Sequence, residues 1–174
     1  MEIHLVRHTT PDVAEGVCYG QTDLPLAQTF DEEAKRVKEQ LPTQVDWVFS
    51  SPLGRCKRLA SLLSEELELV DELKEMNFGA WEMQAWSDIP KDELDPWMRD
   101  FVNKAVPGGE SMKLLSDRVN QWYERLLTMG EGSVIIVSHA GPIRVILSTI
   151  NDTPLEQAFK RYRVDYGEVI TARV

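Results

Sequence analysis

The chain has 174 residues, of which 43% are hydrophobic, and this length and composition predict one domain spanning 1–174. Its 29 Asp and Glu outnumber its 19 Lys and Arg, and the net charge of −10 argues against binding nucleic acid or an anionic membrane surface. An anionic ligand must then be held by a local basic pocket. Cys18 and Cys56 are too few for a disulfide framework, and no apolar run approaches the roughly 18 residues of a membrane span. We therefore expect a cytoplasmic protein.

The first part of the chain alternates strand and helix patterns. Residues 1–6 predict a short apolar strand, and Thr29 with Glu32 has capping-box spacing in front of a helix over 31–41. A second strand is predicted over 45–51. The helix predicted over 55–67 carries leucines at helical spacing on one face, namely Leu59, Leu62, Leu63 and Leu67.

Between 71 and 110 the periodic pattern weakens, and aromatic residues mix with acids and two prolines. The aromatic residues other than tyrosine include Phe78, Trp81, Trp86 and Trp97. This composition indicates an excursion out of the sheet, over about 76–110, that we expect to lie above the site.

The last part of the chain returns to regular patterns. Ser111 is a suitable N-cap for a long amphipathic helix whose apolar positions run from Met112 to Met129. Residues 132–139 are apolar on both faces, as in a central parallel strand, and a helix over 143–150 and a final strand over 168–174 follow. Strands that alternate with helices predict an α/β fold, a three-layer α/β/α sandwich with a mostly parallel central sheet.

Polar residues capable of phosphate chemistry follow three of the predicted strands. In such a sheet, ligands bind beyond the carboxyl ends of the strands. A guanidinium matches phosphate oxygens with two parallel hydrogen bonds, and an imidazole can act as a nucleophile. The residues at these ends are, in chain order, Arg7 and His8, then Ser50, Ser51 and Arg55, then Ser138 and His139.

Three motifs, VRHT, SSPLGRC and VSHAG, occur in this order, each after a predicted strand. Together they resemble the histidine phosphatase superfamily, which has a phosphoglycerate mutase-like fold. The resemblance runs from Ile3 to about Arg144, and the segment RHTTPDVAEGVCYGQTDLPL is similar to the α-ribazole phosphatase branch of cobalamin biosynthesis.

The resemblance implies a role for each matching residue. His8 is the nucleophile that becomes phosphohistidine, Arg7 and Arg55 clamp the phosphoryl oxygens, and His139 is a second imidazole in the phosphate pocket. Glu75 stands at the position of the proton donor. Such a donor is chemically reasonable, because an alkoxide leaves poorly at neutral pH unless it is protonated. The implied substrate contacts are Arg7, Gln21, Thr22, Arg55 and Ala140.

Several residues have competing interpretations. Glu82 and Glu110 are rivals of Glu75 for the acid role, and each is otherwise a solvated loop carboxylate. His4 lies inside the first strand and is interpreted as a core histidine. Met83 stands where many phosphatase relatives have glycine, which predicts a different loop path after it.

The sequence therefore predicts a metal-independent phosphomonoester hydrolase that needs no cofactor. Three histidines, one of them in a strand, are too few for a dinuclear metal centre. The expected partner is a small-molecule phosphomonoester such as α-ribazole 5′-phosphate, and a homodimer is compatible with the sequence. The alternatives are a cofactor-dependent phosphoglycerate mutase and a phosphate-binding module without turnover. Mutases of the superfamily that the chain resembles carry an asparagine shortly after the Arg-His pair, and its absence over 11–15 argues against a mutase.

Overall fold

The computed structural model describes residues 1–174 and contains a five-stranded sheet in the order β3-β2-β4-β1-β5. The strands are β1 (Glu2–Arg7), β2 (Trp47–Ser50), β3 (Glu68–Leu69), β4 (Ser133–Ser138) and β5 (Val169–Arg173). All neighbours pair in parallel except β1 and β5, which are antiparallel. The predicted α/β fold with a mostly parallel sheet is confirmed.

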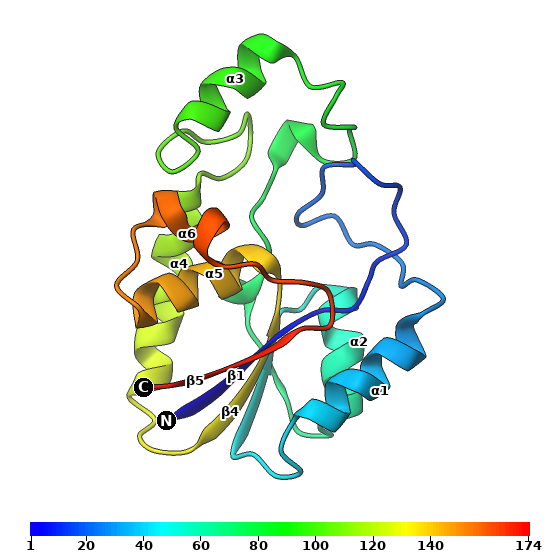
Figure 1. The fold of residues 1–174 in the computed structure, drawn as a ribbon, viewed down its shortest axis with the longest axis vertical. Coiled ribbons are helices and arrows are strands. Elements are labelled where there is room, and N and C mark those ends of the chain that lie inside the picture. Colours follow the sequence, from blue (N-terminus) through cyan, green and yellow to red (C-terminus); the bar gives the residue numbers. More distant parts are fainter.

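Helices cover both faces of the sheet, as Figure 1 shows. The helices are α1 (Phe30–Gln40), α2 (Gly54–Leu63), α3 (Lys91–Arg99), α4 (Met112–Leu127), α5 (Ala140–Ile150) and α6 (Leu155–Arg161). Helices α1 and α2 pack on one face, and α4 and α5 pack on the other, while α3 lies apart at the end of the molecule beyond the strand ends. No helix is both long enough and apolar enough to cross a membrane.

Side-chain alternation along the strands divides the core into two clusters. In β1, Ile3 and Leu5 belong to the cluster with α4 and α5, whereas Val6 belongs to the cluster with α1 and α2. Strand β4 is the middle strand and is buried on both faces, as its apolar sequence predicts. The hydrogen bonding between β1 and β4 continues beyond the end of β1, where the His8 amide donates to the Ser138 carbonyl at 3.0 Å.

His4 is buried in β1, as expected of a core histidine. Its Nδ1 lies 3.0 Å from the Thr171 hydroxyl on β5, while its Nε2 has no hydrogen-bond partner. The ring therefore links the two antiparallel strands, three residues before the end of β1.

Several predicted boundaries were wrong. The capping box does not form: Thr29 makes no side-chain cap, and its hydroxyl donates instead to Glu33 at 2.6 Å. Helix α2 ends at Leu63 and the chain continues into the short edge strand β3, so Leu67 lies outside the helix. Leu62 lies inside the helix, but its side chain is 44% exposed. Met129 also lies beyond the end of its helix, α4.

Five short elements were not predicted, namely β3, α3, α6 and the 3-10 helices η1 (Asp71–Leu73) and η2 (Gly79–Trp81). Helix α3 contains Pro96, which removes a backbone donor and obscures the helical pattern, and it buries none of its residues completely. The N-cap of α4 was predicted correctly, because the Ser111 hydroxyl accepts from the Leu114 amide at 3.2 Å.

Met83 occupies the left-handed region of backbone conformation, with φ at 65°. Its amide donates to the Cys18 carbonyl at 2.7 Å, which ties this turn to the N-terminal loop. A side chain with a Cβ is strained in that conformation, whereas glycine adopts it freely.

We predict that Met83→Gly stabilises the protein by about 0.5–1 kcal/mol, because relief of the strain outweighs the larger backbone entropy of glycine in the unfolded chain. Met129→Gly is the control, since Met129 is similarly exposed but has no positive φ. Urea unfolding of both variants measures the effect. A free energy of unfolding for Met83→Gly below that of the wild type would contradict the prediction.

Candidate active site

The carboxyl ends of β1, β2 and β4 meet at one edge of the sheet. Arg7 pairs with Ser138 and Ser50 pairs with Val137, so the residues that follow these strands lie in one region. Because β4 is between β2 and β1, this arrangement brings together His8, Ser51, Arg55 and His139, all of which are completely or almost completely buried.

The hydrogen bonds of His8 define its tautomer. Its Nδ1 lies 2.7 Å from the Thr9 carbonyl oxygen, which can only accept, so Nδ1 carries the proton. Its Nε2 accepts from Arg55 Nε at 3.3 Å. The Nε2 lone pair is therefore free of a proton, which is the state that a nucleophilic imidazole requires.

Burial lowers the pKa of His8 well below its ordinary value, and the charges of Arg55 and then Arg7 lower it further. The hydrogen bond to Thr9 acts in the opposite direction but does not compensate. Burial also lowers the pKa of His139, followed by the effects of His8 and of Arg55. Both imidazoles are therefore neutral near pH 7.

His139 follows β4 and stands at the N-cap position of α5. Its ring centroid lies 5.0 Å from that of His8, in an edge-to-face arrangement. Its Nε2 lies 2.8 Å from the Ser51 hydroxyl and 3.4 Å from Cys56 Sγ. Burial raises the pKa of the Cys56 thiol, so this cysteine is a neutral packing residue.

The two predicted arginines reach the site from different directions. Arg55 is the second residue of α2 and is anchored by bonds to the carbonyl oxygens of Thr22, at 2.9 Å, and of Gly20. Arg7 donates from Nη1 to the Val164 carbonyl at 2.7 Å, and its Nε is buried without a partner. Two guanidiniums beside two imidazoles form a cationic cluster at the strand ends, in a chain with net charge −10.

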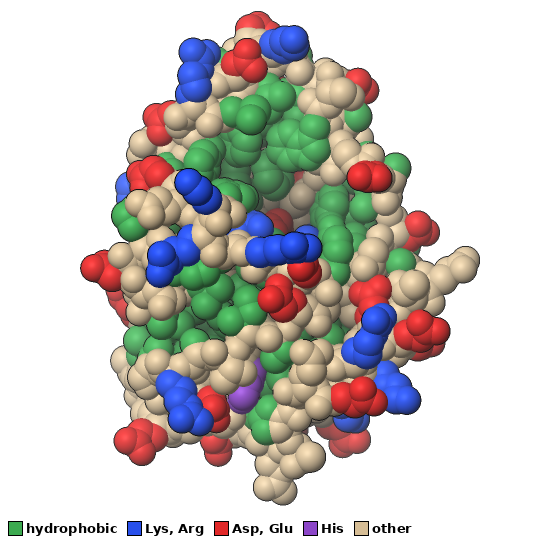
Figure 2. All heavy atoms as spheres, viewed as in Figure 1, with side chains coloured by type: hydrophobic (Ala, Val, Ile, Leu, Met, Phe, Trp, Pro, Cys, Tyr) green, Lys and Arg blue, Asp and Glu red, His purple; other side chains and the backbone are tan.

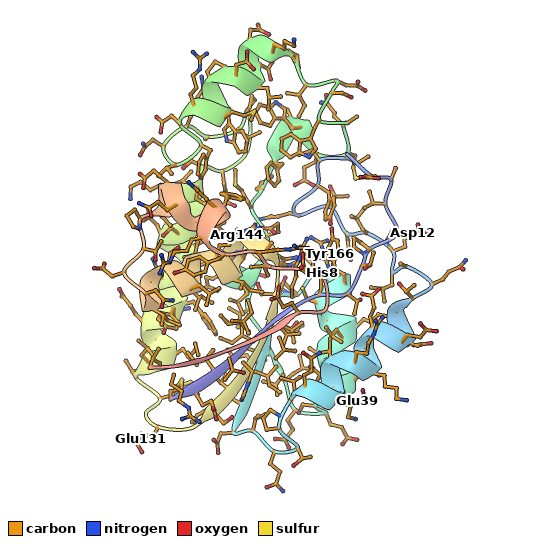
Figure 3. All side chains as sticks on the ribbon, viewed as in Figure 1. His8, Asp12, Glu39, Glu131, Arg144 and Tyr166 are labelled. Carbon is orange, nitrogen blue, oxygen red and sulfur yellow. The ribbon has the colours of Figure 1, made fainter.

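Two tyrosines that the sequence did not single out complete the pocket. The ring of Tyr166 lies 3.7 Å from the Arg7 guanidinium and 5.5 Å from the His8 ring. Its hydroxyl is hydrogen-bonded to that of Tyr19, which faces Arg55. Figure 3 shows Tyr166 next to His8 near the centre of the molecule. Tyr19 and Tyr166 are 147 positions apart, so no local pattern reveals their contact.

Glu82 and Glu110 both act as structural carboxylates. Glu82 accepts from the amides of Gln21 and Thr22 at 2.8 and 2.9 Å, and from the Thr22 hydroxyl. Burial favours a higher pKa for Glu82, but these hydrogen bonds outweigh it and lower the pKa. Glu110 forms an ion pair with Arg118, with both carboxylate oxygens engaged. Neither group is available to protonate a leaving group.

Glu75 is held at the beginning of α5. One carboxylate oxygen accepts from its neighbour Met76 at 2.9 Å, and the other accepts from the Gly141 amide at 3.2 Å. A Cβ at position 141 would collide with this carboxylate, so glycine is needed for the approach. Of the three carboxylates considered for the acid role, Glu75 alone has no side-chain donor on its oxygens.

Arg118 positions the loop that carries Glu75. It donates to the carbonyl oxygens of Glu72, Lys74 and Glu75 at 2.6 to 2.9 Å, besides its ion pair with Glu110. The sequence contained a signal for this role, because Arg118 lies three residues after Leu115 and four before Trp122, on the apolar face of α4.

The predicted substrate contacts border the pocket, although most of their polar groups are bound to the protein. Gln21 donates from its side chain to the Glu75 carbonyl at 3.0 Å. The amide and hydroxyl of Thr22 are both taken by Glu82, and its carbonyl accepts from Arg55. Ala140 is the first residue of α5, directly after His139.

A hollow lined by hydrophobic side chains lies between α3 and the body of the molecule, and Lys or Arg side chains lie at its lower rim (Figure 2). A cavity of about 320 Å³ beside the N-terminal loop includes Val13, Val17, Tyr19, Trp86 and Tyr166 in its lining. The excursion therefore supplies an aromatic wall close to the strand ends. Its aromatic rings pack on one another, with Trp86 stacked on Trp97 at 6.1 Å.

No group of three or more His, Cys, Asp or Glu side chains is arranged to hold a metal ion. The only concentration of imidazoles is the pair formed by His8 and His139, which is accompanied by guanidiniums rather than carboxylates. The arrangement suits a bound phosphoryl group, because its oxygens accept from guanidinium donors while an imidazole nitrogen approaches the phosphorus.

Comparison with known proteins agrees with this geometry. The family model of the histidine phosphatase superfamily (branch 1) matches residues 3–174. The chain belongs to this superfamily, whose members are phosphatases or mutases.

Among its relatives is the probable phosphoglycerate mutase GpmB of Salmonella choleraesuis, which is 32% identical over 165 residues, covering 88% of this chain and 76% of that protein. The α-ribazole phosphatase of Shigella flexneri has a similar structure, with a TM-score of 0.89 and 28% identity over 98% of this chain and 89% of the other. A phosphoglycerate mutase from Thermus thermophilus gives a TM-score of 0.77 and 31% identity, over 98% and 92% of the two chains.

The buried neutral histidines predict a loss of stability in mild acid. Folding lowers the pKa of each of these histidines, so the unfolded chain binds a proton at a higher pH than the folded chain does. The free energy of unfolding therefore falls as the pH drops below 6.5, the pKa of histidine in the unfolded chain. Each such histidine contributes about 1.4 kcal/mol per pH unit within that window. His8→Gln should therefore reduce the slope of unfolding free energy against pH by about that amount.

Denaturant unfolding between pH 7.5 and 5 measures this slope. The carboxylates whose pKa values are lowered, Glu33, Glu72 and Glu82, have an ordinary pKa of 4.5 and contribute mainly below this range. Equal slopes for the wild type and His8→Gln would show that His8 is not held neutral by the fold.

Proposed function

We propose that this protein is a metal-independent phosphomonoester hydrolase that works through a phosphohistidine at His8. Its preferred substrate in this proposal is α-ribazole 5′-phosphate or a related small-molecule ester, and it uses no cofactor. The observation that carries the proposal is the proton-free Nε2 of His8, which faces Arg55 in a buried pocket.

In the first step, the Nε2 lone pair of His8 attacks phosphorus, and the bond between phosphorus and the ester oxygen breaks. Glu75 gives a proton to the departing oxygen, so that a neutral alcohol leaves. Arg7 and Arg55 neutralise the charge on the phosphoryl oxygens as it develops. His139 remains neutral and lines the same pocket at 5.0 Å from the His8 ring.

In the second step, water attacks phosphohistidine and the bond between phosphorus and Nε2 breaks. The Glu75 carboxylate takes the proton from the water, inorganic phosphate is released, and His8 returns to its starting tautomer. The hydrogen bond from Nδ1 to the Thr9 carbonyl persists through both steps and stabilises the positive charge on the phosphorylated ring.

Two observations favour α-ribazole 5′-phosphate. The α-ribazole phosphatase of Shigella flexneri has the higher TM-score of the two solved relatives described above. The cavity of about 320 Å³, with Tyr19, Trp86 and Tyr166 in its lining, also suits a leaving group that carries a flat ring. Mutase activity is the second candidate, because two of the relatives are named as phosphoglycerate mutases. The absence of asparagine over 11–15 argues against it.

The experiment measures release of inorganic phosphate from α-ribazole 5′-phosphate, 2,3-bisphosphoglycerate and p-nitrophenyl phosphate with EDTA present. We expect turnover of the first and third substrates at rates that EDTA does not change. Conversion between phosphoglycerate isomers faster than phosphate release would favour the mutase. Tight binding of phosphate without turnover of any ester would favour a phosphate-binding module, and recovery of a lost activity by Mg²⁺ or Zn²⁺ would overturn metal independence.

The same substrates test the acid role of Glu75. Glu75→Gln should lose on the order of 10²-fold or more of its rate on α-ribazole 5′-phosphate while it keeps a larger share on p-nitrophenyl phosphate, because nitrophenolate leaves without a proton. Glu82→Gln and Glu110→Gln are controls that should affect both substrates equally. Equal losses on both substrates for Glu75→Gln would remove it from the acid role.

A further inference from the structure

Arg144 on α5 has no part in the reaction derived above, yet it lies beside the proposed acid. It lines a small cavity of about 100 Å³ together with Glu75, and the rest of the lining is apolar apart from glycine. The apolar members include Met76, Phe78, Met112, Leu115 and Phe159. The cavity therefore presents one carboxylate and one guanidinium on hydrophobic walls.

The guanidinium of Arg144 is held in place but not neutralised. Its Nε donates to the Tyr162 carbonyl at 3.1 Å, and its Cζ lies 4.6 Å from the centre of the Phe159 ring. Neither terminal nitrogen has a hydrogen-bond partner in the protein, and no carboxylate is within ion-pair distance of it. The two terminal nitrogens are not among the buried polar atoms that lack a partner, so they reach solvent and are free to donate to a ligand.

The charges of Glu75 and Arg7 both act on Arg144. Burial lowers the pKa of Arg144, the charge of Glu75 raises it, and the charge of Arg7 lowers it again. Arg144 is thus close enough to sense both groups, and Figure 3 shows it in the same central region as His8 and Tyr166. A substrate whose ester oxygen faces Glu75 would bring its neighbouring atoms to Arg144.

We propose that Arg144 is a specificity-determining residue that donates a hydrogen bond to a hydroxyl group of the substrate, a few bonds from the ester oxygen. This inference rests on the proposed function and names the substrate class as phosphate esters of polyols and sugars. A hydroxyl fits the pair because it accepts from Arg144 and donates to Glu75. A carboxylate would have no proton to donate to Glu75, and an alkyl group would leave Arg144 unpaired.

Three matched esters test the inference: propyl phosphate, glycerol 3-phosphate and the phosphate ester of 3-hydroxypropionate. We expect the wild type to favour glycerol 3-phosphate over propyl phosphate by about tenfold or more in kcat/KM, as for a hydrogen bond to a charged donor. Arg144→Met should abolish this preference by losing rate on glycerol 3-phosphate alone. Arg144→Lys, which retains one charged donor, should keep part of it.

Arg161→Met is the control, because Arg161 is an exposed arginine on α6, and this variant should retain the full preference. Turnover of p-nitrophenyl phosphate by each variant verifies that the pocket is folded. A preference that survives in Arg144→Met would overturn the inference, as would an Arg144-dependent preference for the carboxylate ester.

If the proposed function is wrong, the wild type hydrolyses none of the esters, including p-nitrophenyl phosphate. This result differs from the one that would overturn the role of Arg144. In that case calorimetry, which compares the affinities for glycerol 3-phosphate and propyl phosphate, tests the role of Arg144 without turnover. Tighter binding of the glycerol ester that is lost in Arg144→Met would support it, and equal affinities would contradict it.

Discussion

The hydrogen bond from His8 Nδ1 to the Thr9 carbonyl is the interaction on which the site depends. At 2.7 Å it is a strong, buried bond, and it fixes the proton on the nitrogen that faces the backbone. The opposite nitrogen is then a lone-pair donor that Arg55 Nε approaches at 3.3 Å. In the other tautomer, Nε2 would present a proton to the Arg55 N–H, and the imidazole would lose both its hydrogen bond and its nucleophilic nitrogen.

The surroundings maintain this state at a cost in stability. Burial and two guanidiniums exclude a proton from His8 and also from His139, so the fold keeps two neutral imidazoles beside concentrated positive charge. A bound phosphoryl group would offset that charge. Arg118, Glu110 and Glu82 support the pocket from outside, because they hold the loops that carry Glu75 and Thr22 without contacting the candidate nucleophile.

The sheet and the strand-end residues could be predicted because both follow from local patterns. Alternation and apolar runs place four of the five strands, and polar residues directly after a parallel strand must lie at its carboxyl edge. Contacts between distant segments could not be predicted in this way. Nothing near Tyr166 indicates Arg7 and Tyr19 as its neighbours, and only the folded chain shows that Glu82 and Glu110 are occupied by hydrogen bonds while Glu75 lies against Gly141. The short elements β3, α3 and α6 were missed for a related reason, since their stability comes from packing rather than from a long periodic pattern.

The most direct measurement of the central claim is rapid acid-free quenching of the enzyme during turnover of a ³²P-labelled phosphomonoester, followed by mapping of the labelled residue. We predict acid-labile phosphate attached to Nε2 of His8, formed and discharged at rates that match turnover, with none in His8→Ala. Label on His139, attachment to Nδ1 of His8, or full turnover by His8→Ala would contradict it.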